Sequence, residues 1–476
     1  MKAILGLDIG TTTICGVGVS TSGELLVSVE RPNDSAVAGL PTGRTEQDPR
    51  RIRERVVEVL SELGERISDV AGIGITGQMH GMMCLDERAE PLGNLVTWQD
   101  GRCLEPDAHG RSSLEQMRIL VPARVWDACG CLPASGFMGS TLFWLSRDRA
   151  TLRGVVRVSF AADWIAGWLT EQMPVTDPSH AGSAGVFNLA AMAWHRRICE
   201  ALDLPVELLP PVRESGEVIG RLSAATARAT GLPAGTPVCN AIGDNQASVL
   251  GSIAQMDNSV LVNLGTGGQI SWAIPGFSRA EGMETRYLPM KRYMLVGASL
   301  CGGRALAWLN DVVREWIAPF AGVPDRETVY ARLVGLASLA PGGAGGLTAR
   351  TTLAGTRTDP LLRGSFEGVS LDNFKLGNVA RAVLEGIIEE LCAFYRSSVG
   401  ERDSDHTVVV ASGNAVRKNP LFREIISSRF GLPVVVPRHR EEASFGAALL
   451  AGVSTGVWPD LGAAGQHVGY AAHTPE

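Results

Sequence analysis

The sequence predicts an α/β protein built from two lobes, and three observations support this prediction. Short apolar strands alternate with amphipathic helices along the chain, which is typical of sheets covered by helices. A glycine-threonine turn between two strands occurs at Gly10-Thr11 and again at Gly265-Thr266. The length of 476 residues suits about two to four domains, so two large lobes are the simplest arrangement.

Both turns join a strand to a strand. Residues 3–9 and 14–20 are predicted strands on either side of a GTTT turn, and residues 259–274 repeat the arrangement. A P-loop or a Rossmann turn leads instead from a strand into a helix. A short polar residue, Asp8 or Asn263, stands two positions before each turn, which indicates two related lobes facing one nucleotide. Two unrelated hairpins with common turn residues are the alternative.

The other predicted elements follow the same alternation. A helix with one apolar face is predicted over residues 49–67, where Pro49 suits the first turn, and a strand over 70–76. In the second half, the pattern predicts a long helix, a strand and another helix, at 378–399, 407–412 and near 418–430. We place the lobe boundary near residue 240, which divides the chain into residues 1–240 and 241–476.

Composition excludes several classes of partner. Lysine plus arginine total 43 against 50 aspartate plus glutamate, a net charge of −7, and no basic run provides a footprint for nucleic acid. Nine cysteines without a CxxC pair favour reduced thiols in a cytoplasm. No stretch reaches the roughly 18 apolar residues of a membrane span. We therefore expect a cytoplasmic protein with a small-molecule ligand and no nucleic-acid or membrane partner.

Two polar segments of the first half suit a sugar-like ligand. TGQMHG follows a predicted strand, so Gln78, Met79 and His80 are expected at the C-terminal end of that strand, where open α/β sheets bind ligands. In TWQDGRC, Trp98 and Asp100, with an amide and a guanidinium beside them, suit a small polyhydroxylated molecule. A polar loop with a half-buried tryptophan is the alternative.

The second half supplies a carboxylate and a glycine loop. Asp244 in GDNQAS stands behind a glycine, where it can accept a proton from a hydroxyl nucleophile, and the alternative is an N-cap for a helix that starts with Ala247. ASGNAVRKNP joins a strand to a helix through Gly413, which lets a flat base lie against backbone. The cysteines and histidines show no zinc spacing, so any metal is expected to be Mg²⁺ on carboxylates and phosphate.

All these segments, in this order, resemble the FGGY carbohydrate kinases, members of the actin-like ATPase superfamily, over residues 3–452. The C-terminal signature of that family matches without a gap at Gly364, Phe366, Gly368, Val369, Asn378, Val379, Ala382, Val383, Leu384 and Glu385. The resemblance implies an α/β fold of two actin-like (ribonuclease H-like) lobes with a nucleotide and sugar cleft between them. It also implies ATP and Mg²⁺ as cofactors and a phosphotransferase that acts on an alcohol group.

The resemblance also points to a class of sugar. GQMHG is similar to the ketose-binding motif of xylulokinases and sedoheptulokinases, whereas glycerol kinases carry an Arg-Glu pair where this chain has Met79-His80. Residues 35–39, 96–103 and 243–249 look most like sedoheptulokinases. This favours ATP-dependent phosphorylation of the terminal hydroxyl of sedoheptulose to sedoheptulose 7-phosphate, with D-xylulose to D-xylulose 5-phosphate as the runner-up.

The resemblance further implies a role for each matching residue. Asp8 would hold Mg²⁺ through water, and Asp244 would be the catalytic base. The residues that would contact phosphates are Gly10, Thr11 and Thr12, together with Gly265 and Thr266 at the γ-phosphate. Those that would border the adenosine are Gly302, Gly303, Gly413 and Arg417. Those that would border the sugar are Gln78, Met79, His80, Trp98 and Asp100.

One departure from the family and two rival classes remain. Cys15 stands where the family usually places lysine or arginine, and a thiol cannot neutralise phosphate charge. Mg²⁺ with Arg102 or Arg304 is therefore expected to compensate. The alternatives are that ATP binds weakly or that the phosphate donor differs.

The rivals are an actin-like ATPase chaperone or filament protein and a sugar-sensing regulator without catalysis. A homodimer is compatible with every one of these interpretations.

Overall fold

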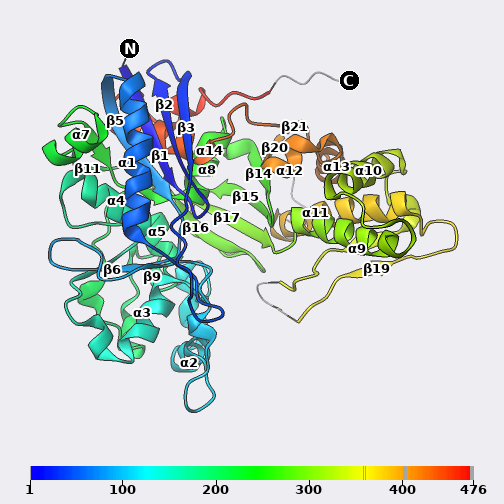
Figure 1. Ribbon diagram of the computed structural model, residues 1–476, viewed down its shortest axis with the longest axis horizontal. Helices are drawn as coiled ribbons and strands as arrows, with labels where there is room; N and C mark the ends of the chain where they lie inside the picture. Colours follow the sequence, from blue (N-terminus) through cyan, green and yellow to red (C-terminus); the bar gives the residue numbers. More distant parts are fainter. Residues whose placement is uncertain (1, 357–358, 360, 400–404, 472–476) are drawn as a thin grey trace.

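The computed structural model describes residues 2–356, 359, 361–399 and 405–471 of the chain. It contains two mixed sheets, one in each half of the sequence, and helices pack against both of them (Figure 1). The prediction of an α/β protein with two lobes is therefore confirmed. None of the helices in these ranges is long and apolar enough to cross a membrane.

The first sheet has the strand order β11-β12-β5-β1-β2-β3, with β13 pairing to β5 as well. Its strands are β1 (Lys2–Ile9), β2 (Thr13–Ser20), β3 (Leu25–Pro32), β5 (Asp69–Gly77), β11 (Val218–Arg221), β12 (Pro237–Cys239) and β13 (Ile242–Gly243). β5 runs parallel to both β1 and β13, with Ile9 and Gly243 each paired to Gly77. The residues that follow these three strands therefore emerge at one edge of the sheet.

Two long helices cover the faces of this sheet. On one face, α1 (Pro49–Arg66) starts after Asp48, whose side chain accepts a hydrogen bond from the Arg50 N–H, and buries an apolar stripe. On the other face lies α14 (Glu442–Ser454), which comes from the end of the chain. It approaches so closely that a Cβ on Gly6 would lie 1.8 Å from the Ser444 carbonyl oxygen. The first sheet is therefore completed by the C-terminal part of the sequence.

The second sheet has the order β16-β17-β15-β14-β20-β21. Its strands are β14 (Ser259–Leu264), β15 (Gly268–Ile274), β16 (Glu284–Leu288), β17 (Arg292–Ser299), β20 (Val408–Ser412) and β21 (Val434–Val435). The helices of this lobe are α9 (Gly303–Ala321), α10 (Arg326–Leu339), α11 (Leu376–Val399), α12 (Asn414–Lys418) and α13 (Pro420–Phe430). The helix expected near 418–430 is observed as α13, which Asn419-Pro420 separates from the preceding α12 and which Asn419 caps.

The remaining elements lie mostly in a long insertion after β5, which packs its own apolar core below the first sheet (Figure 1). They are β4 (Glu46–Gln47), β6 (Met83–Leu85), β7 (Leu95–Val96), α2 (Ser113–Leu120), α3 (Met138–Ser146), β8 (Arg157–Ser159), α4 (Ala161–Thr170), α5 (Pro178–Ser183), β9 (Phe187–Asn188), β10 (Ala193–Trp194), α6 (Arg196–Ala201) and α7 (Ala224–Thr230). β18 (Thr348–Arg350), β19 (Ser365–Glu367) and α15 (Leu461–Gly465) belong to the second half.

The helix α8 (Asp244–Ser252) connects the two sheets and packs against α14. The two helices touch backbone to backbone, since a Cβ on Gly251 would lie 1.9 Å from the Glu442 carbonyl oxygen. The division at residue 240 stays a prediction. The first sheet nevertheless takes up β13 beyond that position, so the sequence crosses between the sheets through α8.

Candidate functional site

The first glycine-threonine turn is held from within its own lobe. The Asn33 side-chain amide donates to the Gly10 carbonyl oxygen at 2.7 Å, and the Gln47 side-chain amide donates to the Thr11 carbonyl oxygen at 2.8 Å. The Asn33 backbone N–H donates to the Thr12 carbonyl oxygen. These bonds fix the backbone of the turn through its carbonyl groups. Gly10, Thr11 and Thr12 thus form a braced loop, and their contact with phosphates stays a prediction.

Asp8 precedes this turn, and one oxygen of its carboxylate is buried. Among the residues that the structure describes, none donates to its buried Oδ1. Burial, followed by the negative charge of Asp244, raises the pKa of Asp8 to about 7. An orphaned carboxylate oxygen beside a second carboxylate suits a divalent cation, and oxygen is the ligand that Mg²⁺ prefers. No cluster of three metal-ligating side chains occurs in the described ranges, so phosphate or water would have to complete such a site.

The second turn brings three of the predicted nucleotide glycines together. The Gly303 N–H donates to the Gly265 carbonyl oxygen and the Arg304 N–H to the Thr266 carbonyl oxygen, at 2.9 and 3.0 Å. A Cβ on Gly302 would lie 2.2 Å from the Gly267 carbonyl oxygen. The start of α9 is therefore joined directly to the turn between β14 and β15.

Gly413 reaches the same place from β20. It adopts a φ of 91°, which favours glycine, and a Cβ there would lie 2.4 Å from the Leu264 carbonyl oxygen. Arg417, one turn farther on, donates to the carbonyl oxygens of Pro437 and His439 and to Glu442 at 2.8, 2.5 and 2.7 Å. Its guanidinium thus ties α12 to the start of α14, and its contact with adenosine stays a prediction.

The first sugar segment is hydrogen-bonded to the phosphate turn. Gln78 is buried, and its amide donates to Gln47 Oε1 at 2.8 Å. Trp98 Nε1 donates to Thr11 Oγ1 at 3.0 Å, and that hydroxyl donates to Gln78 Oε1 at 3.3 Å. Trp98 remains 45% exposed, so part of its side chain is accessible to a ligand. The structure therefore places Gln78, Trp98 and Thr11 side by side.

Met79 and His80 turn toward the insertion. Met79 is buried, and its sulfur would lie 2.7 Å from a Cβ on Gly243. His80 has a φ of 73°, stacks on Phe137 with ring centroids 4.1 Å apart, and places Nδ1 2.8 Å from the Ser183 carbonyl oxygen. A small cavity beside them is also lined by Glu284 and Arg286 of β16. The sugar segment and the second sheet therefore both line this cavity.

Asp100 and Arg102 bond to each other and not to the centre of the site. Asp100 is buried and accepts hydrogen bonds from the Thr45 N–H at 2.7 Å and from Arg102 Nε at 2.8 Å. Arg102 also bonds Glu46 and lies over the Trp144 ring. Asp100 thus shapes the loop that carries Trp98, and its own contact with sugar stays a prediction. Both acids pair with the Arg102 guanidinium, which weakens its ability to offset phosphate charge, and that role stays a prediction.

Cys15 lies on β2, opposite Asp8 of β1, and its side chain contacts α14. It is buried, and its sulfur is 3.6 Å from Ser444 Oγ on α14. Burial raises the pKa of this thiol to about 12, so it stays neutral. Arg304 is the other arginine predicted to compensate for the missing basic residue. Its backbone N–H is bonded to Thr266, and its side chain is exposed.

Asp244 occupies the first position of α8, and Gly243 is the N-cap. The alternative interpretation of Asp244 as the cap of a helix starting at Ala247 is therefore wrong. One carboxylate oxygen accepts a hydrogen bond from the Asn245 N–H at 2.7 Å, while the side chain stays partly exposed. Burial raises the pKa of Asp244, and the Asn245 N–H and the charges of Arg286 and His180 oppose that shift.

Three paired parallel strands lead into the proposed site. β1 is followed by Gly10, β5 by Gln78 and β13 by Asp244. Gly243 and Ile9 both pair with Gly77, so the residues after them emerge together. Sequence reasoning missed Arg286 and Asn245, which approach from the second half: Arg286 donates to Asn245 Oδ1, and the Asn245 amide donates to Gln269 Oε1. No local motif marks Arg286, because it lies within an ordinary strand.

Loss of the tryptophan bond gives a testable effect. We expect Trp98→Phe to raise the KM for the sugar roughly 2- to 12-fold, because it removes one hydrogen bond to Thr11. Steady-state kinetics measures this. Trp458→Phe is the matched control, since Trp458 donates to the Thr21 carbonyl oxygen far from the site and should leave KM unchanged. Equal KM values for both variants would contradict the assignment of Trp98.

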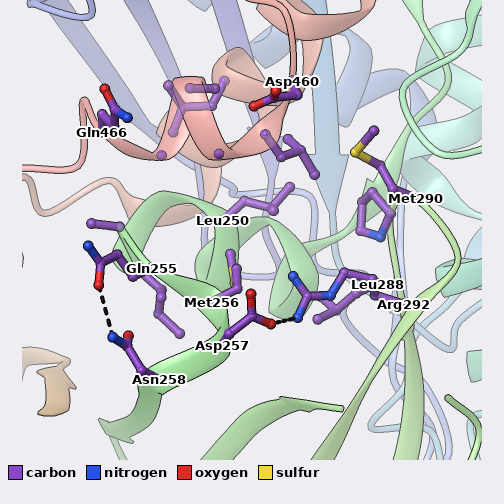
Figure 2. Close-up of a pocket in the computed structure, with 18 residues that line it drawn as sticks. Leu250, Gln255, Met256, Asp257, Asn258, Leu288, Met290, Arg292, Asp460 and Gln466 are labelled. Atoms are coloured by element: carbon purple, nitrogen blue, oxygen red, sulfur yellow. Dashed lines mark hydrogen bonds and ion pairs between the residues drawn. The ribbon is translucent and has the colours of Figure 1, made fainter. Parts of the chain in front are cut away.

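A larger cavity of about 520 Å³ lies at the opposite end of α8 (Figure 2). Leu250, Met256, Leu288, Met290 and Asp460 are among its lining residues. Figure 2 shows mainly apolar side chains around it, with the Arg292–Asp257 ion pair at one side. None of the predicted site residues lines this cavity, so size alone does not identify the functional site.

Comparison with known proteins agrees with this geometry. The profile of the FGGY family of carbohydrate kinases matches in both parts, the N-terminal domain over residues 3–251 and the C-terminal domain over residues 277–455. Human sedoheptulokinase (Homo sapiens) is 30% identical over 94% of this chain and 96% of its own length. A glycerol kinase from Trichlorobacter lovleyi is 29% identical over 85% of this chain and 80% of its own length.

Solved structures share the whole fold. The xylulose kinase from Rhodospirillum rubrum superposes with a TM-score of 0.87 and 26% identity, covering 100% of this chain and 94% of that one. Both family domains match in order, the sequence relatives span nearly the full length, and the lobes superpose on an actin-like sugar kinase. The chain therefore belongs to the FGGY family of carbohydrate kinases and is a sugar kinase.

Proposed function

We propose that this kinase transfers the γ-phosphate of ATP to the terminal hydroxyl of a ketose, with sedoheptulose as the substrate and sedoheptulose 7-phosphate as the product. The observation that carries the proposal is the meeting of Asp244, the Gly10-Thr11 turn and the Gln78 segment at one sheet edge. The 30% identity with sedoheptulokinase supports the choice of sugar. The GQMHG segment, with Met79-His80 in place of the Arg-Glu pair of glycerol kinases, supports a ketose over glycerol.

In the proposed reaction, Asp244 accepts the proton of the terminal hydroxyl while that oxygen attacks the γ-phosphorus in line and ADP leaves. The raised pKa of Asp244 makes it a better base than an ordinary aspartate near neutral pH. Trp98 and Gln78 orient the sugar beside the turn that holds the phosphates. Because phosphoryl transfer depends mainly on positioning, the bracing of that turn by Asn33 and Gln47 is part of the same machinery.

Mg²⁺ fits the residues of this site. The orphaned Oδ1 of Asp8 would hold it through water, and it would supply positive charge against the phosphates. Arg304 at the second turn would supply a further positive charge. It would compensate for the lysine or arginine that the family usually has at the position of Cys15. Gly302, Gly303 and Gly413 let the proposed nucleotide loops pack backbone to backbone around the second turn, since a Cβ at any of them would meet backbone.

A panel of sugars tests the proposal. ADP release is measured with sedoheptulose, D-xylulose, L-ribulose, D-fructose and glycerol at saturating Mg-ATP, and kcat/KM is expected to be highest with sedoheptulose. D-xylulose is the second candidate, since the R. rubrum xylulose kinase shares the fold over the whole chain. A preference for D-xylulose would overturn the choice of sugar, and a preference for glycerol would overturn the ketose class.

A further inference from the structure

The short helix α5 (Pro178–Ser183) contacts two separate parts of the site. It packs against β13, which leads into Asp244, and against β16, which carries Arg286. Its residues Ser179 and Ser183 are four positions apart, so their side chains share one face of the helix. Both side chains are buried. The proposed reaction uses neither hydroxyl, yet each is bonded to a segment that it does use.

Ser179 holds the backbone immediately before the proposed base. The Gly243 N–H donates to Ser179 Oγ at 2.8 Å, and the same hydroxyl donates to Asp177 Oδ1 at 2.8 Å. Gly243 is the N-cap of α8, and Asp244 follows it directly. A shift of this peptide would therefore move the Asp244 carboxylate.

Ser183 holds the sugar segment in the same manner. The His80 N–H donates to Ser183 Oγ at 3.1 Å, and this hydroxyl donates to the His180 carbonyl oxygen at 2.7 Å. His80 has a positive φ, which costs energy in a residue other than glycine and needs support from its surroundings. The bond from Ser183 contributes to that support.

His180 fixes α5 to the rest of the lobe. It lies between the two serines, is fully buried, and stacks on Phe160 with ring centroids 5.0 Å apart. Its Nδ1 lies 3.4 Å from Asp163 Oδ1 on α4 and 3.3 Å from Asp177 Oδ1. An imidazole placed between these two buried carboxylates links α5 to α4.

We propose that α5 is a positioning element, in which Ser179 fixes the peptide that carries Asp244 and Ser183 fixes the His80 segment that borders the sugar. This inference rests on the proposed function, because it has Ser179 position the proposed base and Ser183 position the proposed sugar-binding segment. It predicts a division of effects. Ser179 acts on the chemical step, whereas Ser183 acts on sugar binding.

Two alanine variants test this division. We expect Ser179→Ala to lower kcat about tenfold with the ketose KM within about twofold of wild type, because a small displacement of a base costs rate more than binding. We expect Ser183→Ala to raise the ketose KM about tenfold with kcat within about threefold. Ser179→Cys keeps the packing and accepts hydrogen bonds only weakly, so kcat should fall to an intermediate value with the thermal midpoint unchanged.

Ser215→Ala is the matched control. Ser215 is also buried and donates to the other oxygen of Asp177 at 2.5 Å, but it is bonded to neither functional segment, so both kinetic parameters should stay within about twofold. Equal changes in all three alanine variants, or a lowered thermal midpoint with kcat and KM unchanged in Ser179→Ala, would overturn the proposal.

A double mutant separates this inference from the proposed function. If Asp244 is the base, Asp244→Asn lowers turnover by itself, and adding Ser179→Ala should cause no further loss, because the positioned group is already gone. Full additivity of the two losses would overturn the positioning role and leave the base intact. Normal turnover in Asp244→Asn alone would overturn the role of the base, and with it the role of Ser179.

Discussion

Replacing Asp244 with asparagine is expected to lower kcat for sugar phosphorylation by about 10²–10⁴-fold, since general-base catalysis typically contributes that much. The carboxylate is partly exposed at the start of α8, and its charge acts on Asp8 in the first lobe. Asparagine keeps the shape and cannot accept the proton of the sugar hydroxyl. Binding of Mg-ATP should stay within a few-fold of wild type, because the turns at residues 10–12 and 265–266 are untouched. Rapid-quench or coupled assays measure the rate, and calorimetry measures the binding.

A second aspartate provides the control for this experiment. Asp460 caps α15 by accepting a hydrogen bond from the Ala463 N–H at 2.8 Å, and asparagine caps helices about as well as aspartate. Asp460→Asn therefore changes charge without removing a proton acceptor from the site, and should keep wild-type kcat. Turnover near the wild-type rate in Asp244→Asn would show that another group activates the sugar hydroxyl.

Gly446→Ala is expected to cost about 3 kcal/mol or more in the free energy of unfolding. A Cβ at this position would lie 1.9 Å from the Ala247 carbonyl oxygen and 2.7 Å from the Gly251 nitrogen, both on α8. Backbone atoms cannot turn aside as a flexible side chain can, so α8 and α14 would have to separate. Because α8 also carries Asp244, we expect activity to fall along with stability. Urea unfolding measures the first effect and steady-state kinetics the second.

Gly335→Ala is the matched control within the same chain. Gly335 lies inside α10, where nothing is within 4 Å of a Cβ, so alanine should stabilise the protein by roughly 0.5–1 kcal/mol through its higher helix propensity. The two substitutions are chemically identical and should differ in sign. A wild-type unfolding midpoint for Gly446→Ala would mean that the two helices are not packed backbone to backbone.

Most of the local structure could be predicted from the sequence. The helices expected at 49–67 and 378–399 are observed as α1 and α11, and the two strand-turn-strand units as β1-β2 and β14-β15. These predictions succeed because apolar periodicity reports directly on which face of an element is buried. The helix expected near 418–430 is likewise observed, as α13.

The candidate site was only partly predictable. Thr11, Gln78 and Trp98 were singled out by their motifs, and the structure joins them by hydrogen bonds. Asp100 and Arg417 had equally suggestive motifs, but their charged groups bond to neighbours in the fold. A motif identifies a candidate residue, but it does not show which groups its side chain will contact, because these depend on segments far away in the chain.

The sequence by itself determined the element types, the paired turns and the family, because local periodicity and short motifs carry that information. Only the tertiary structure decided that residues 442–454 complete the first sheet, that Cys15 faces Ser444, and that α5 joins Gly243 to His80. The physical reason is that each of these contacts joins residues that are 64 or more positions apart in the sequence. Such contacts depend on glycines and buried hydroxyls whose partners no local pattern identifies.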